Sequence, residues 1–340
     1  MAQTKIDWTD WSWNAYSGCD PVSPGCDNCY MPGMAIRQAG RNGYPMGDPT
    51  KVTFHPDKLE KPLHMRKPKK IFVNSMYDLF HEDISFEEIA DIFRVMAQAN
   101  WHTFQILTKR PERMLEFFNS VKRSKEGFLT HNGDSPYAYG GKGQLCGYTE
   151  WPLPNVWLGV TAENQEMADK RIPILLQTPA AVRFVSVEPM LGPVDLTDLP
   201  VPESVDDRVI CHRMNALTSM DDDHFYNIHP KLDWVICGGE TSRKARPCHP
   251  AWVRSLRDQC EQYGTPYFFK GWGEWTEDAE GNRYGHPGAP RAQYVDINTG
   301  SIPLGNRADM AIMWKLGKKA SGRLLDGVEH SEFPKAVKPC

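Results

Sequence analysis

Residues 71–110, IFVNSMYDLFHEDISFEEIADIFRVMAQANWHTFQILTKR, hold a strand, a helix and a second strand, and this order indicates the fold. Residues 71–73 and 104–107 are compact apolar runs of strand length. Between them, Ser85 and Glu88 have the spacing of a capping box, which predicts the start of a helix. Strands that alternate with helices favour a parallel sheet, so we expect a βαβ unit here.

The same alternation continues on both sides of this unit. Further strands are predicted at residues 156–160, 182–187, 234–237 and 267–269, with one more near residues 8–16, and helices at 165–177 and 250–263. These elements make six or seven β/α units. We therefore predict an α/β fold, a partial or complete (β/α) TIM-like barrel with loop insertions.

The barrel is expected to span residues 1–276 as one domain. Residues 124–152 and 194–231 break the rhythm with glycine-rich, polar or acidic sequence, so we interpret them as insertions. Residues 277–340 are rich in glycine, proline and charge and are expected to form an irregular extension packed on the barrel. The basic run from Lys61 to Lys70 precedes a strand, which favours a solvated face at the bottom of the barrel.

Composition narrows the class of protein. The chain has 340 residues and a formal net charge of −4, so no overall positive field attracts nucleic acid or membranes. It contains no apolar run of about 18 residues and no signal-like N-terminus, which predicts a cytoplasmic protein with no membrane partner. In that compartment its nine cysteines are expected to be metal ligands, buried thiols or reactive groups rather than disulfides.

Three of these cysteines stand close together. Cys19, Cys26 and Cys29 have the spacing C-x6-C-x2-C, and Pro21, Pro24 and other turn residues indicate a shaped loop. A structural zinc site usually has four protein ligands. His81 or Cys146 could complete the set, but neither is close to the three cysteines in sequence. Three thiolates without a fourth suit a [4Fe-4S] cluster that leaves one iron open. Iron–sulfur, zinc and metal-free thiols remain the three alternatives.

Several short blocks of the sequence together resemble a known family. These blocks are IDWTD (6–10), the cysteine loop, VNSM (73–76), DLFH (78–81), LTKRP (107–111), NVWLGV (155–160), EP (188–189), GGE (238–240) and FFK (268–270). Over residues 4–275 the chain resembles a phage- and prophage-associated three-Cys-motif family of unknown function, assigned to barrels of the radical S-adenosylmethionine (SAM) type. The chain departs from the usual radical SAM spacing C-x3-C-x2-C by three extra residues, and Asn28 replaces the usual aromatic residue.

The resemblance implies a catalytic role for Cys19, Cys26 and Cys29 as ligands of a [4Fe-4S] cluster. The open iron would bind SAM, and one electron from a flavodoxin- or ferredoxin-like donor would cleave SAM to a 5′-deoxyadenosyl radical. Phage association suggests a nucleotide or modified DNA base as the substrate of an isomerase, lyase or transferase reaction.

Polar residues at the predicted strand ends supply the other candidates, because ligands bind at the carboxyl ends of parallel strands. We expect SAM contacts from Asn74, Ser75, Asp78, Lys109, Glu188, Gly238, Gly239 and Glu240. Substrate contacts are expected from Arg110, Glu163, Arg246 and Lys270. Solvated loop residues are the plain alternative for each of them. For the whole chain, the alternatives to an enzyme are a zinc-stabilised barrel that binds nucleic acid or protein, and a degenerate barrel without turnover.

Overall fold

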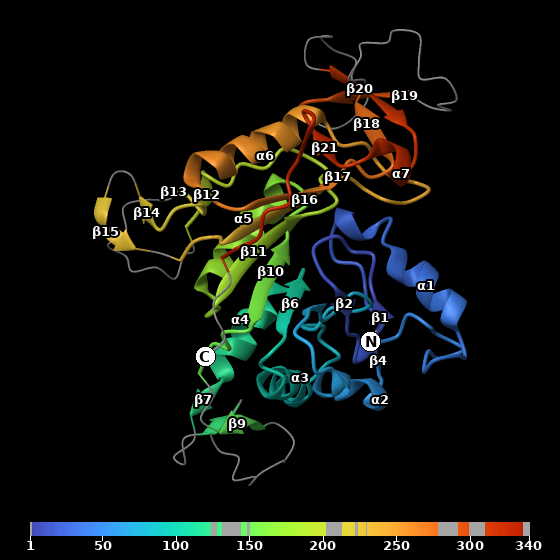
Figure 1. Ribbon diagram of the computed structural model, residues 1–340, viewed down its shortest axis with the longest axis vertical. Helices are drawn as coiled ribbons and strands as arrows, with labels where there is room; N and C mark the ends of the chain where they lie inside the picture. Colours follow the sequence, from blue (N-terminus) through green and yellow to red (C-terminus); the bar gives the residue numbers. More distant parts are fainter. Residues whose placement is uncertain are drawn as a thin grey trace.

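The computed structural model describes residues 2–123, 128–130, 144–147, 150–201, 213–221, 224–228, 230–277, 292–298 and 310–335 (Figure 1). Its centre is one eight-stranded sheet with the order β1-β2-β5-β6-β10-β11-β16-β17. The strands are β1 (Ala2–Gln3), β2 (Trp11–Ser12), β5 (Lys70–Phe72), β6 (Thr103–Thr108), β10 (Val156–Thr161), β11 (Val182–Val187), β16 (Trp234–Gly238) and β17 (Tyr267–Gly271). The seven strands from β2 onward are parallel, and only β1 is antiparallel to its neighbour.

Helices follow four of these strands and cover one face of the sheet (Figure 1). They are α3 (Phe86–Gln98), α4 (Pro111–Ser120), α5 (Gln165–Gln177) and α6 (Pro250–Tyr263). The predicted capping box is present, since Ser85 accepts from the backbone of Glu88 and the Glu88 side chain accepts in return. Helix α6 ends at Gly264, whose φ of 64° is left-handed and suits a residue without a side chain. The predicted elements of the sheet are therefore confirmed.

The sheet is curled into an open half-barrel. Its order begins at β1 and ends at β17, and no pairing in the described part of the chain joins these two strands. The main core fills the space between the sheet and the helices. A second, aromatic cluster lies on the other face of the sheet and contains Trp8, Phe72, Trp157, Phe184, Trp234 and Phe268. Gly159 leaves room for this cluster, because a Cβ there would lie 2.5 Å from the Phe184 ring.

A smaller unit near the N-terminus adjoins the first strands. It contains β3 (Tyr16–Ser17), the 3-10 helix η1 (Pro24–Cys26), α1 (Tyr30–Gln38), β4 (Thr53–Phe54), α2 (Pro56–Leu59) and η2 (Lys61–His64). Strand β3 pairs with β4. The segment between these two strands carries the cysteine loop and α1, which both lie beside the carboxyl ends of the parallel strands (Figure 1).

The predicted insertions and the C-terminal extension are described only in part. The first insertion falls mostly outside the described residues. Its described part includes β8 (Phe128–Thr130), which pairs with β7 (Lys122–Arg123) on one side and with β9 (Gln144–Gly147) on the other. The second contains two short hairpins, β12 (Leu199–Pro200) with β13 (Arg213–Met214) and β14 (Met220–Asp221) with β15 (His224–Ile228).

The extension was expected to be irregular, and its described residues differ from that expectation. Strands β19 (Ala292–Asp296) and β20 (Met310–Lys315) form a sheet with β18 (Trp275–Glu277), and α7 (Lys318–Ser321) and the hairpin β21 (Leu324–Leu325) with β22 (Val328–Glu329) follow. Buried Val295 and Met313 give this sheet an apolar face, which the charged composition obscures. No helix in the described ranges is long and apolar enough to cross a membrane.

Candidate metal and cofactor site

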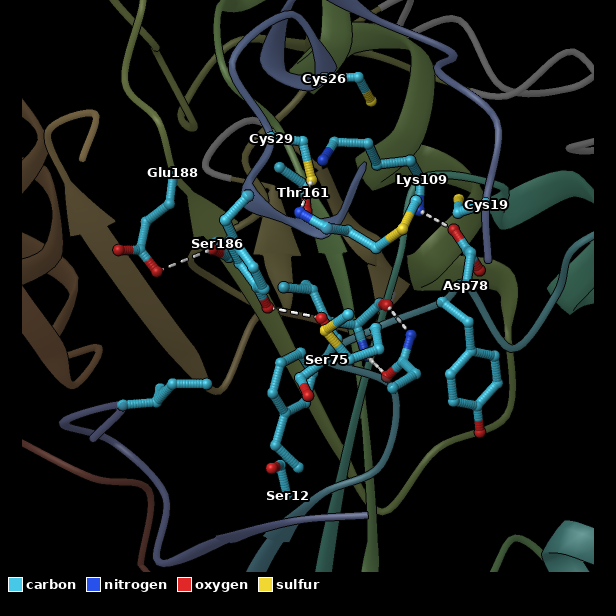
Figure 2. A pocket seen from close by; sticks show the side chains of 18 of the residues that line it. Ser12, Cys19, Cys26, Cys29, Ser75, Asp78, Lys109, Thr161, Ser186 and Glu188 are labelled. Carbon is cyan, nitrogen blue, oxygen red and sulfur yellow. Dashed lines mark hydrogen bonds between the residues drawn. The ribbon is translucent and has the colours of Figure 1, made fainter. Parts of the chain in front are cut away.

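A cavity of about 650 Å³ lies at the carboxyl ends of the parallel strands. Figure 2 shows Cys19, Cys26 and Cys29 toward one end of it and Ser12 toward the other. Most of the predicted site residues line this cavity, namely Cys19, Cys26, Cys29, Asn74, Ser75, Asp78, Lys109, Arg110, Glu188 and Lys270. The volume is within the range of sites that enclose small organic ligands.

Each of the three thiols lies near a hydrogen-bond donor. The Cys29 sulfur accepts from the Met31 backbone N–H at 3.5 Å, because Cys29 is the N-cap of α1. Arg110 Nη1 lies 3.6 Å from the Cys19 sulfur, and Ser23 Oγ lies 4.0 Å from the Cys26 sulfur. A guanidinium and a helix N-terminus both favour negative charge on sulfur, the form that binds metals.

Glu163, which follows β10, holds the middle of the cysteine loop. Its Oε1 accepts from the Gly25 backbone N–H at 3.1 Å and from the Ser23 hydroxyl, and its Oε2 lies 2.9 Å from Arg171 Nη1. Glu163 and Arg171 are 0% and 3% exposed in their side chains, so this ion pair is fully buried. A Cβ on Gly25 would lie 2.8 Å from Glu163 Oε1, so the close approach needs glycine.

Glu240 and Arg246 hold the same loop from the end of β16. Arg246 Nη2 donates to Glu240 Oε1 at 2.7 Å and to the Pro24 carbonyl at 2.9 Å, and its Nη1 lies 3.1 Å from Asp27. The Asn28 amide donates to Glu240 Oε2 at 3.1 Å. Two strand ends thus fix the chain between Cys19 and Cys29 without using any of the three thiols.

Asp78 organises the cavity wall beside Cys19. Its Oδ1 accepts from Thr108 Oγ1 at 2.7 Å, its Oδ2 accepts from the Lys109 backbone N–H at 3.0 Å, and Arg110 Nη1 lies 3.4 Å from Oδ2. Burial raises the pKa of the Cys19 thiol, and the nearby Asp78 carboxylate raises it further, while Arg110 opposes this change. Arg110 therefore links the Asp78 carboxylate to the first thiol of the motif.

The end of β5 is fixed by amide side chains. Asn74 donates to the Leu107 carbonyl at 2.5 Å and accepts from the Leu107 N–H at 3.2 Å, so its amide joins the ends of two strands. Asn14 donates to the Ser75 hydroxyl at 2.9 Å, and the Tyr30 hydroxyl donates to the Ser75 carbonyl at 2.5 Å. Both polar atoms of the Asn74 amide are therefore used within the protein.

Glu188 and Lys270 form an ion pair on the opposite wall. The Lys270 Nζ lies 3.0 Å from Glu188 Oε1, and Ser186 Oγ donates to Glu188 Oε2 at 3.3 Å. Gly238 makes room for this pair, because a Cβ there would lie 2.6 Å from Glu188 Oε1. A Cβ on Gly239 would lie 2.1 Å from the Trp272 carbonyl oxygen, so this second glycine permits backbone packing.

The predicted site residues therefore separate into two groups. Glu163, Gly238, Gly239, Glu240 and Arg246 were predicted to contact SAM or substrate, and none of them is among the residues that line the cavity. Three of them, Glu163, Glu240 and Arg246, instead bind the cysteine loop.

Sequence reasoning also missed several cavity residues, including Lys5, Trp8, Asn14, Tyr30 and Lys318. The position of Asn14 just after the predicted strand near residues 8–16 is a signal that could have identified it. Trp8 and Lys5 come from the antiparallel start of the chain, which the β/α pattern does not predict.

The possible fourth ligands of a zinc site lie elsewhere. His81 is fully buried, its Nε2 lies 3.3 Å from Asp20 Oδ2, and it does not line the cavity. Cys146 is on β9, where no side chain is described. Within the described ranges, no three His, Cys, Asp or Glu side chains are grouped closely enough to surround one metal ion. Thiolates are the soft donors that iron–sulfur clusters use, and the three thiols line the same cavity.

Comparisons with known proteins give a family and no further relative. No curated protein and no solved structure matches the chain. One family model, described as a protein of unknown function (DUF5131), matches residues 3–334 and so includes the cysteine loop, the seven parallel strands of the sheet and most of the C-terminal extension. The chain therefore belongs to the DUF5131 family.

Proposed function

We propose that this protein is a radical SAM enzyme in which Cys19, Cys26 and Cys29 hold a [4Fe-4S] cluster. The observation that carries the proposal is that all three thiols line one cavity at the carboxyl edge of a parallel half-barrel. That edge is where β/α folds place their ligands. When bound, the cluster would supply one electron to cleave a carbon–sulfur bond of SAM.

The protein's own residues would orient SAM and balance its charge. Lys109 lines the cavity, and no described carboxylate forms an ion pair with its side chain. It is our candidate for binding the SAM carboxylate. Glu188 is our candidate for an ammonium group, because it lies on the opposite wall with only Lys270 as its ionic partner among the described residues. Asp78, Arg110 and Asn74 are assigned to positioning, since their polar atoms are already bound to the protein.

The substrate proposal is a nucleotide or a modified base. Trp8 and Phe72 both line the cavity, and their ring centroids lie 4.9 Å apart. The two rings offer apolar surface to a planar group. The Trp8 Nε1 is buried without a hydrogen-bond partner among the described residues, so a base could accept from it. Lys5 and Lys318 also line the cavity and would attract a phosphate.

The test is SAM cleavage by anaerobically reconstituted protein. With dithionite as reductant, 5′-deoxyadenosine should accumulate and be measured by chromatography. Cys26→Ala should abolish its formation and remain folded, and Cys260→Ala, a buried thiol on α6, is the matched control that should retain it. Absence of cleavage in wild-type protein that holds a reducible cluster would contradict the radical SAM proposal.

A further inference from the structure

The surface around α1 is unusually apolar for exposed protein. Of the ten large hydrophobic side chains that are exposed in the described part of the chain, six lie between residues 22 and 54. Ile36 is 63% exposed and Met46 is 76% exposed, and Met34 and Tyr30 are also exposed on the same helix as Ile36. Groups of exposed apolar side chains commonly mark binding surfaces.

The same region is positively charged in a protein whose total charge is negative. Residues 30–61, which include α1 and α2, contain five Lys or Arg and three Asp or Glu, against a net charge of −4 for the chain. Arg37 on α1 uses its Nε on the Gly33 carbonyl, and neither Arg37 nor Arg41 forms an ion pair with a described carboxylate. These cations are therefore available to an acidic partner.

A shallow groove in this surface leads toward the cysteines. It lies between α1 and α2, and its lining includes Met34, Tyr44 and Met76 as well as Lys58, Lys61 and one carboxylate, Asp57, which lies 3.6 Å from Lys61 Nζ. Met76 belongs to a small buried cluster against which both Cys19 and Tyr44 pack. Met34 and Met76 line the groove and the main cavity alike. Met34 and Met76 therefore lie between the groove and the cavity that contains the first thiol of the motif.

We propose that this groove is the docking surface of a small acidic electron-carrier protein that reduces the cluster, an inference that rests on the proposed function. One electron would pass from the reduced carrier to the cluster, so the carrier is oxidised by one electron and no bond is made or broken. An apolar centre with a cationic rim suits a protein partner, because steering comes from charge and contact from apolar area. Nucleic acid would instead be held by phosphate contacts and aromatic stacking. Of the six exposed apolar side chains, two are aromatic, Tyr30 and Phe54, and the two most exposed, Ile36 and Met46, are not.

The experiment compares two reductants on reconstituted protein. Bleaching of the cluster absorption is followed by stopped flow with reduced flavodoxin, an acidic carrier, and separately with dithionite. Arg37→Glu/Arg41→Glu is compared with Lys170→Glu/Lys231→Glu, which changes the net charge equally at sites away from α1. We expect the α1 variant to be reduced by flavodoxin at least tenfold more slowly, with an unchanged dithionite rate. The control should keep both rates, and the wild-type flavodoxin rate should fall as salt increases.

The outcomes separate this proposal from the one before it. Protein without a reducible cluster would overturn both. A normal cluster whose reduction by flavodoxin is unaffected in the α1 variant would overturn the docking surface alone. Loss of binding of a fluorescent DNA oligonucleotide by the α1 variant, with unchanged flavodoxin kinetics, would assign the surface to nucleic acid instead.

Discussion

Two sets of residues share one sequence signature, a polar side chain just after a strand, yet they differ in what surrounds them. Lys109, Glu188 and Lys270 line the cavity and keep some exposure. Glu163 and Glu240 are buried, at 0% and 6% exposure, and their oxygens are occupied by the cysteine loop and by arginines. We call these two groups the cavity set and the loop-holding set.

The difference shows that a residue at a strand end lies near the site, but its position alone does not determine whether it binds a ligand or holds the protein together. A carboxylate whose oxygens are already bound by the protein positions its neighbours, whereas a charge with few protein partners remains available to a ligand. Substitution in the loop-holding set should therefore change stability and cluster content, and substitution in the cavity set should change SAM binding in a protein that remains folded.

The largest effect is expected for Glu163→Ala. The change leaves the Arg171 guanidinium buried and unpaired, and removing one partner of a buried ion pair costs about 3–5 kcal/mol in the free energy of unfolding. Urea denaturation of the apoprotein measures this cost. Asp198→Ala, which breaks the exposed pair with Arg213, is the control and should cost less than about 1 kcal/mol. Equal losses in the two variants would contradict the loop-holding assignment.

Adjacent glycines provide a matched pair of the next size. Gly239→Ala places a Cβ against the Trp272 backbone, and we expect a loss of about 2–3 kcal/mol in stability. Gly238→Ala meets the Glu188 side chain, which can move, so it should be less destabilising and should instead weaken SAM binding. Denaturation curves and SAM titrations on both variants decide this. The reverse ranking would show that the Glu188 wall is rigid and not displaced by the Cβ.

Lys109→Ala tests the cavity set directly. Loss of one charged contact should raise the KM for SAM about tenfold, equivalent to about 1.4 kcal/mol, and leave the denaturation midpoint close to that of the wild type. Lys170→Ala, an exposed lysine on α5, is the surface control. If Lys109→Ala lowers stability as much as Glu163→Ala does, the two sets are not functionally distinct.

The smallest effect concerns a histidine outside both sets. Burial lowers the pKa of His55 from 6.5 to about 4, and its Nε2 is 2.8 Å from Ser17 Oγ. The unfolded chain then binds a proton below pH 6.5 that the folded protein does not, so stability should fall as pH decreases from about 6.5 toward 4. His55→Gln should flatten this decrease when urea denaturation is followed across that range. His64→Gln, at an exposed histidine, is the control. Identical pH profiles of stability for the wild type and His55→Gln would exclude His55 as the cause of the decrease.

The sheet could be predicted from sequence because each strand is a compact apolar run with a polar end. The sequence predicted strands at residues 156–160 and 182–187, where β10 and β11 lie, since buried parallel strands have this composition. The sequence left a partial and a complete barrel as alternatives and did not predict the antiparallel β1, because closure depends on pairings between distant segments.

The sequence predicted where the site lies, but it did not predict which strand-end residues line the cavity and which hold the cysteine loop. Asp78 and Lys109 are close in space because β5 and β6 end side by side, which the strand pattern implies. The contacts of Glu163 and Arg246 with the cysteine loop join residues more than 130 positions apart, and no local pattern encodes them. Trp8 was missed because one aromatic residue near the N-terminus carries no periodic signal.

The most direct test of the central claim is an anaerobic EPR spectrum of the reconstituted, reduced protein before and after SAM is added, with iron, sulfide and zinc counted. The account predicts a brown protein with close to four irons per chain, whose EPR signal shifts when SAM binds the open iron. A colourless protein with one zinc per chain and no response to SAM would contradict it.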